Sequence, residues 1–248
     1  MVNYTLEACV DSVESALGAS KGGATRLELC SNLIIGGTTP SQWLFKEIRK
    51  HTDIKINALI RPRFGDFCYS DYEFNIMKEE VLMFKELGAD GVALGILRPD
   101  GALNLEQMDI LIKLSGEMEV TLHRAFDVCI NPYEALEQAK ELGASSILTS
   151  GQKNTCTAGS GLIKELVELS RGELAILVGG GVDAFVIREI GPLTGAKAYH
   201  MSGKVSMDSA MEFRKEGISM GLPFLDEYVI WKTDEGKIRE ARTALEEL

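Results

Sequence analysis

At four places along this chain, a glycine–alanine pair stands directly before a short apolar stretch with the two-residue period of a β-strand. The pairs are Gly23-Ala24, Gly88-Ala89, Gly143-Ala144 and Gly195-Ala196. Glycine can end a helix by adopting a left-handed conformation, and the small alanine lets the next strand pack closely. The repeat therefore predicts helix-to-strand junctions spread along most of the sequence.

Strand-like and helix-like stretches alternate throughout. The eight strand candidates lie at about 2–9, 25–30, 54–61, 90–96, 119–124, 145–150, 174–179 and 197–202. The glycine–alanine pairs precede the second, fourth, sixth and eighth strands, so a two-strand unit is used four times. This pattern predicts an α/β fold, a (β/α)8 TIM-type barrel, in one domain over 1–248. A doubly wound sheet is the alternative, but no Gly-x-Gly-x-x-Gly follows the first strand.

The end of the chain departs from this regular pattern. Residues 204–233 show no clear strand periodicity, and we expect a long loop there. The final helix is expected at about 234–247, with a charged face in water.

Composition narrows the classes of function. The formal net charge is −11 without a basic run, which argues against nucleic acid or an anionic membrane as a partner. The N-terminus lacks the pattern of a signal peptide, and no stretch approaches the ~20 apolar residues of a spanning helix. Five cysteines without dense spacing favour a reduced, cytoplasmic protein. A homo-oligomer is compatible with the sequence.

Two of the cysteines belong to a repeated pattern, Glu-x-Cys, which closes the first and second strand candidates. The copies are Glu7-Ala-Cys9 and Glu28-Leu-Cys30. Side chains two positions apart in a strand share a face, so parallel neighbours would bring two thiols and two carboxylates together. We expect matched copies, with the Cα atoms of Cys9 and Cys30 within about 7 Å, the limit for a disulfide. The cluster could instead hold a soft metal ion or line an active site.

Other strands carry polar residues in the same phase. In a barrel the apolar phase faces the helices, and the polar phase points inward and gathers at the carboxyl ends of the strands, where barrel enzymes place their sites. The polar set consists of Glu7, Cys9, Glu28, Cys30, Arg61, Arg63, His123 and His200. A buried ion-pair network is the alternative reading, although one of this size is costly to bury without a function.

A glycine-rich segment follows the seventh strand candidate and opens a helix. We expect Gly180 and Gly181, in Gly179-Gly180-Gly181-Val182-Asp183, to offer backbone N–H groups to a phosphate or another anion. Ser150, after the sixth strand, could add a hydroxyl group. A tight turn with no ligand is the alternative.

Longer motifs resemble those of the CutC copper-homeostasis family. They are Ile60-Arg-Pro-Arg-Phe-Gly-Asp-Phe-Cys-Tyr-Ser70, His123-Arg-Ala-Phe-Asp127, Cys9-Val-Asp-Ser-Val-Glu14, Leu27-Glu-Leu-Cys30, Gly36-Gly-Thr-Thr-Pro-Ser41, Leu148-Thr-Ser-Gly151 and His200-x-Ser202, within about 2–215. The resemblance implies a (β/α)8 barrel, a cytoplasmic location, a link to copper and Cu(I) binding by Cys9 and Cys30. The site positions that it implies are Glu7, Glu28, Arg61, Arg63, Asp66, His123, Arg124, Asp127, His200 and Ser202. Glycine is common in the family where this chain has Phe64, and we expect the phenylalanine to narrow the barrel mouth.

Two functions follow from these features. In the first, the protein binds Cu(I) through a cysteine pair, because thiolates are ligands that Cu(I) prefers. In the second, it is an enzyme for a small anionic or phosphorylated metabolite, whose reaction the sequence does not define. Its expected acids and bases are Glu7, Glu28, His123, Asp127 and His200. Its expected substrate-binding residues are Arg61, Arg63, Asp66, Arg124, Ser150, Gly180, Gly181 and Ser202.

Overall fold

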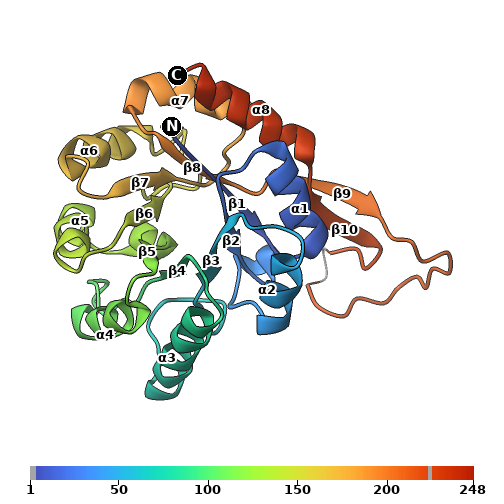
Figure 1. Cartoon of the computed structure of the whole chain (residues 1–248), viewed down its shortest axis with the longest axis horizontal. Coiled ribbons are helices and arrows are strands. Elements are labelled where there is room, and N and C mark those ends of the chain that lie inside the picture. The colour runs from blue at the N-terminus through green and yellow to red at the C-terminus, as the bar shows by residue number, and fades with distance from the viewer. Residues whose placement is uncertain (1–3, 223–224) are drawn as a thin grey trace.

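A computed structural model describes residues 4–222 and 225–248, and within these ranges eight parallel strands close into a barrel surrounded by helices (Figure 1). The barrel strands are β1 (Thr5–Val10), β2 (Arg26–Leu29), β3 (Lys55–Leu59), β4 (Gly91–Leu94), β5 (Glu119–Leu122), β6 (Ser146–Thr149), β7 (Ala175–Val178) and β8 (Ala198–Met201). The α-helices are α1 (Val13–Gly22), α2 (Gln42–Arg49), α3 (Asp71–Glu86), α4 (Leu105–Ser115), α5 (Pro132–Glu141), α6 (Ser160–Ser170), α7 (Ala184–Thr194) and α8 (Glu235–Glu246). Two short 3₁₀ helices, η1 (Leu33–Ile35) and η2 (Arg124–Val128), follow β2 and β5. The predicted (β/α)8 barrel is confirmed, and the eight strands overlap their expected positions; residues 2 and 3 of the first strand candidate lie outside the described residues.

The glycines of the repeat act as predicted. Gly23 and Gly195 end α1 and α7 with φ angles of 94° and 69°, in the left-handed region where a side chain would be strained. Gly88 and Gly143 adopt the same conformation after α3 and α5. Each junction reverses the chain toward the next strand. None of the helices in the described part of the chain is long and apolar enough to cross a membrane.

Alternate side chains of each strand face two different environments, the helices outside the barrel and the interior of the barrel. Outward-facing side chains such as Leu6, Ala8 and Leu27 are fully buried and form the main core with the helices. Inward-facing residues near the amino ends of the strands are largely polar, and Thr121 and Ser146 share a 2.8 Å hydrogen bond between their hydroxyl groups. Helix packing therefore provides most of the apolar burial, and the barrel interior is free to hold charges.

The prediction of a plain loop at 204–233 is wrong at both ends. Strands β9 (Lys204–Asp208) and β10 (Val229–Thr233) pair antiparallel and extend beyond α1, away from the barrel (Figure 1). Their side chains are mostly exposed, so burial on one face imposes no clear alternation on the sequence. Helix α8 follows as expected, with Asp234 capping its first turn through the N–H of Lys237.

A test of the interior packing is Gly91→Ala at the start of β4. A methyl group there would collide with Asn57 Oδ1 and lie 2.6 Å from the carbonyl oxygen of Glu119. Overpacking of this kind costs about 1–3 kcal/mol, which denaturant unfolding would measure. The control is Gly161→Ala in α6, where nothing lies within 4 Å and stability should be equal or higher. Equal stability of the two variants would contradict this account of the interior.

Candidate functional site

A pocket of about 270 Å³ opens at the carboxyl ends of the strands, here named the barrel-mouth pocket. Its lining consists of Cys9, Glu28, Leu33, Gly36, Leu59, Arg61, Phe67, His123, Arg124, Leu148, Gly180, Gly181, Val182, His200, Met201 and Ser202. The lining includes many of the residues predicted from the polar phase. The sequence pattern therefore located the face of the barrel at which this pocket opens.

An ion pair lies directly below the pocket, inside the barrel. Arg26 Nε donates to Glu7 Oε2 at 2.5 Å, and the same guanidinium group reaches Glu119 at 3.1 Å. The side chain of Glu7 is only 1% exposed. Burial alone would raise the pKa of Glu7, but Arg26 and then His200 outweigh it and lower this pKa to about 2. Glu7 is therefore an anion at neutral pH.

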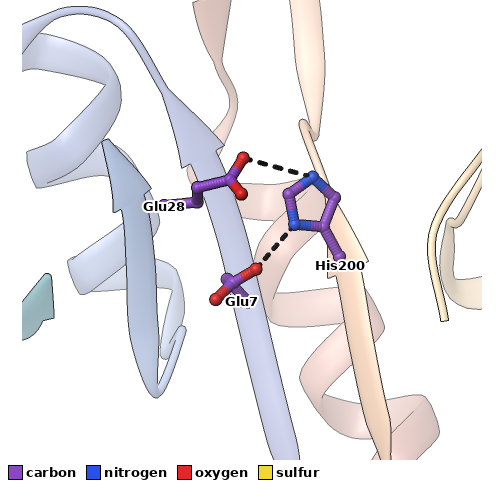
Figure 2. Close-up of side chains that lie close together, drawn as sticks. All are labelled: Glu7, Glu28 and His200. Atoms are coloured by element: carbon purple, nitrogen blue, oxygen red, sulfur yellow. Dashed lines mark hydrogen bonds and ion pairs between the residues drawn. The ribbon is translucent and has the colours of Figure 1, made fainter. Parts of the chain in front are cut away.

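The imidazole of His200 lies between two carboxyl groups, as Figure 2 shows. Its Nδ1 is 2.7 Å from Glu7 Oε1, and its Nε2 is 4.0 Å from Glu28 Oε2. Burial would lower the pKa of His200, but Cys9, Glu28 and Glu7 together raise it well above its ordinary value. His200 is therefore expected to be an imidazolium at neutral pH, whose Nδ1–H donates a hydrogen bond to Glu7.

Glu28 is the second buried carboxyl group of this cluster. Burial raises its pKa; His200 opposes the rise and Glu7 adds to it. The Cys30 thiol donates to Glu28 Oε2 at 3.4 Å. A carboxyl group with a raised pKa beside an imidazolium is suited to proton transfer near neutral pH.

The same three side chains could also hold a metal ion. One ligand atom each from Glu7, Glu28 and His200 lies within 4.8 Å of the others. However, Arg26 and His200 already bind the two carboxylate oxygens of Glu7. Strong internal pairing of this kind favours a proton-transfer network over an ion site.

His123 faces the pocket from the end of β5 in a defined protonation state. Its Nδ1 accepts a hydrogen bond from the N–H of Ala125 at 3.2 Å, which places the proton of a neutral ring on Nε2. Burial, and then the charge of Arg61, lower the pKa of His123 to about 3. The ring packs against Phe67, with centroids 4.9 Å apart. His123 is therefore a neutral, fixed hydrogen-bond donor at neutral pH.

Arg61 enters the pocket from the chain following β3. Its terminal nitrogens donate to the carbonyl oxygens of Gly36, Gly37 and Gly65, and its guanidinium lies over Phe67. These bonds fix the group and leave Nε without a partner among the described residues. Two loops thus hold one donor rigidly at the pocket.

Arg61 Nε is one of three buried polar atoms on lining residues that lack a hydrogen-bond partner in the described part of the chain. Glu28 Oε1, Arg61 Nε and His123 Nε2 have no hydrogen-bond partner among the described residues. Most buried polar atoms in proteins are paired, and an unpaired one costs about 1–3 kcal/mol. One acceptor and two donors on residues that line the pocket therefore remain unpaired within the described chain.

The expected alignment of Cys9 with Cys30 is not observed. Cys9 lies opposite Glu28, so the two Glu-x-Cys copies are offset by two residues, the stagger that a closed barrel requires. Both thiols remain on the inner face in one small cluster and are free. Diagonal neighbours are roughly 7–8 Å apart, beyond the favourable range for a disulfide.

Arg63 and Asp66 lie in the loop beside the pocket and are absent from its lining. Arg63 donates to the carboxylates of Glu73 and Asp66 and to the carbonyl oxygens of Phe64, Asp66 and Cys68, and these bonds hold the loop together. Phe64 is 65% exposed and also lies outside the lining, so the expected narrowing of the mouth is not observed.

Asp127 and Ser150 join two loops. The carboxylate of Asp127 accepts bonds from Arg124, Thr149 and the N–H groups of Ser150 and Gln152. The Ser150 hydroxyl bonds to Asp127 and the carbonyl of Lys153. Among the predicted residues of this region, only Arg124 reaches the lining.

The glycine-rich turn lies in the pocket as expected. Gly180 and Gly181 have φ angles of 92° and 85°, and the N–H groups of both lack a hydrogen bond within the described chain. The first turn of α7 is capped by its own Asp183, which accepts from Val186. The turn can therefore offer N–H groups to an anion, whereas the N–H of Val186 at the helix start already has a partner in Asp183.

Arg26, Phe67 and the Gly36-Gly37 turn have roles that the sequence did not assign. Arg26 had the correct phase, two residues before Glu28, but the offset between strands was needed to pair it with Glu7. Phe67 and the glycine turn lie within the motifs of the resemblance, which was the available signal.

The three histidines allow a direct test of the protonation states. In NMR spectra assigned with single His→Asn variants, His200 should keep its proton as pH rises above 6.5, because anionic neighbours raise its pKa. His123 should stay neutral as pH falls below 6.5, until about pH 3. Glu7→Gln should lower the pKa of His200. Titration of both rings near 6.5 would contradict the described electrostatics.

Comparison with known proteins agrees with the sequence motifs. A CutC family model matches residues 4–205. A family protein CutC of Vibrio vulnificus (strain YJ016) is 39% identical over 249 residues, covering 100% of both chains. The mouse copper homeostasis protein cutC homolog is 40% identical over 237 residues, covering 95% of this chain and 87% of the mouse protein.

A solved structure shows the same relationship. The crystal structure named for the copper homeostasis protein CutC from Streptococcus agalactiae superposes with a TM-score of 0.77 at 33% identity. It covers 80% of this chain and 98% of the streptococcal chain. Sequence, family motifs and fold agree, and the chain belongs to the CutC family.

Proposed function

We propose that this protein is an enzyme that binds a small anionic metabolite in the barrel-mouth pocket. The observation that carries the proposal is the set of three buried, unpaired atoms: Glu28 Oε1, Arg61 Nε and His123 Nε2. A ligand that accepts from the arginine and histidine and approaches the carboxyl group would satisfy all three. Such convergent polar groups in one cleft are typical of binding sites for small molecules.

The charges of the pocket divide it into two parts. Arg61, with Gly180 and Gly181 also in the lining, offers N–H donors that suit a phosphate or carboxylate. Glu28 and His200 form the proton-transfer part, with a raised pKa on each. A simple metal-binding role would require neither the fixed arginine nor the neutral histidine.

Inorganic phosphate should stabilise the wild-type protein by mass action, by about 2.7 kcal/mol at 100 times its Kd. The rise in melting temperature should be much smaller in Arg61→Lys, which loses Nε and its fixed geometry. Arg63→Lys is the matched control, because Arg63 belongs to the same motif but lies outside the pocket lining. Equal rises in all three proteins would show that phosphate does not bind at Arg61.

A second candidate function is Cu(I) binding through Cys9 and Cys30, which would connect this chain to the copper homeostasis named for its mouse relative. The supporting observation is that both thiols face inward in one buried cluster, a donor set that suits a soft ion. Burial, and then Glu28 and Cys9, raise the pKa of Cys30, so copper would have to displace its proton. Five free thiols also suit the reducing cytoplasm, where we place the protein.

The copper hypothesis predicts about one equivalent of Cu(I) per chain, measured on reduced protein against a competing chelator. Replacing Cys9 and Cys30 by alanine should abolish this binding. The control replaces Cys129 and Cys156, two buried cysteines that pack in the outer core. Unchanged affinity in the first double variant would place any copper site elsewhere.

A further inference from the structure

We infer that the barrel-mouth pocket transfers a proton at a carbon next to a carbonyl group, with Glu28 as base and Arg61 and His123 stabilising the enolate oxygen. The inference rests on the proposed function and specifies its reaction and substrate class. The substrate is a small hydroxycarbonyl compound with a phosphate or carboxylate group. The pattern that carries it is one unpaired acceptor and two unpaired, fixed donors in a single pocket.

The donor at His123 is fixed on every side. Its Nδ1 is occupied by the N–H of Ala125, Phe67 packs on the ring, and Gly95 makes room for it. A methyl group at residue 95 would lie 2.8 Å from the imidazole. A neutral imidazole can donate to a carbonyl oxygen and to the enolate formed from it, without giving up a proton too early.

Arg61 supplies the second donor. The carbonyl oxygens of Gly36, Gly37 and Gly65 hold its terminal nitrogens, so Nε–H is kept in place before a ligand arrives. Donors arranged in advance at the position where negative charge develops are a large source of catalysis. The two donors lie near each other, because both groups pack on Phe67: the guanidinium carbon of Arg61 is 5.0 Å, and the ring centroid of His123 4.9 Å, from the centroid of the phenylalanine ring.

Glu28 is arranged as the base. Its Oε2 receives the Cys30 thiol and faces His200, whereas Oε1 has no partner. No lysine is among the lining residues, so a Schiff base with the substrate carbonyl is not available at this pocket. The remaining route to a stabilised carbanion is direct polarisation of the carbonyl by hydrogen bonds.

The step balances without any further reactant. The ionised Glu28 takes the proton from the carbon, the C–H electron pair forms a carbon–carbon double bond, and the carbonyl π electrons move to oxygen. Protonated Glu28 then returns the proton, on the same face, to the neighbouring carbon, which was the carbonyl carbon. The proton of the substrate's hydroxyl group passes to the former carbonyl oxygen, so that the carbon bearing the hydroxyl becomes the new carbonyl carbon. The product is an isomer of the substrate, and nothing is oxidised or reduced overall.

The test measures exchange of carbon-bound hydrogen with D₂O by ¹H NMR, using dihydroxyacetone phosphate and hydroxypyruvate as probes. Dihydroxyacetone, which lacks the anionic group, is the matched control compound. With at least one anionic probe, wild-type protein should accelerate hydrogen exchange well above the rate in buffer. The Glu28→Gln substitution should reduce the protein-catalysed exchange rate by about 10²–10⁴-fold. Gly95→Ala should also slow exchange by displacing His123, whereas the surface variant Glu165→Gln should match the wild type.

The outcomes separate this inference from the proposed function. If an anionic probe shifts the His123 NMR signals but exchange stays at the buffer rate, the inference is overturned and the anion-binding proposal stands. If neither anionic probe binds, both are overturned. Exchange that persists in Glu28→Gln at the wild-type rate would overturn Glu28 as the base.

Discussion

The buried pair of Arg26 and Glu7 is the interaction on which the site depends. It keeps Glu7 ionised inside the barrel, and the second oxygen of Glu7 then holds the imidazole of His200. The imidazolium in turn faces Glu28 at 4.0 Å. Removing one partner of a buried pair typically costs about 3–5 kcal/mol, so this chain of charges is stable only as a unit. The apolar core between the strands and the helices stabilises the fold and offsets the cost of burying these charges.

The fold was readable from the sequence because its signals are local. A two-residue period placed every barrel strand, and a left-handed glycine such as Gly23 or Gly195 ends the preceding helix wherever it occurs. The hairpin of β9 and β10 was missed because exposed strands need no alternation of polarity. Register was also missed: the offset of two residues between β1 and β2 comes from barrel closure, a property of all eight strands together.

The phase of the strands predicted which polar residues would line the barrel-mouth pocket, whereas residue type alone did not. Glu28, Arg61, His123 and His200 reach the pocket because strand geometry fixes their direction. Arg63 and Asp127 have equally reactive side chains, yet they saturate their hydrogen bonds within loops. Sequence shows which groups are present near the barrel mouth, but not whether a neighbouring carbonyl or N–H already satisfies them. That difference depends on loop conformation.

The proposed copper binding and the proposed proton transfer involve neighbouring groups. The Cys30 thiol donates a hydrogen bond to Glu28 Oε2. A Cu(I) ion on Cys30 would displace the thiol proton and so remove this hydrogen bond. The added thiolate charge would be balanced by the metal, but Glu28 would lose a hydrogen bond that orients it. Because Cys9 also helps to raise the pKa of His200, a metal on Cys9 would change the charge next to the imidazolium. The two proposed functions would therefore be coupled, because copper on the thiols would change the charges and hydrogen bonds around Glu28 and His200.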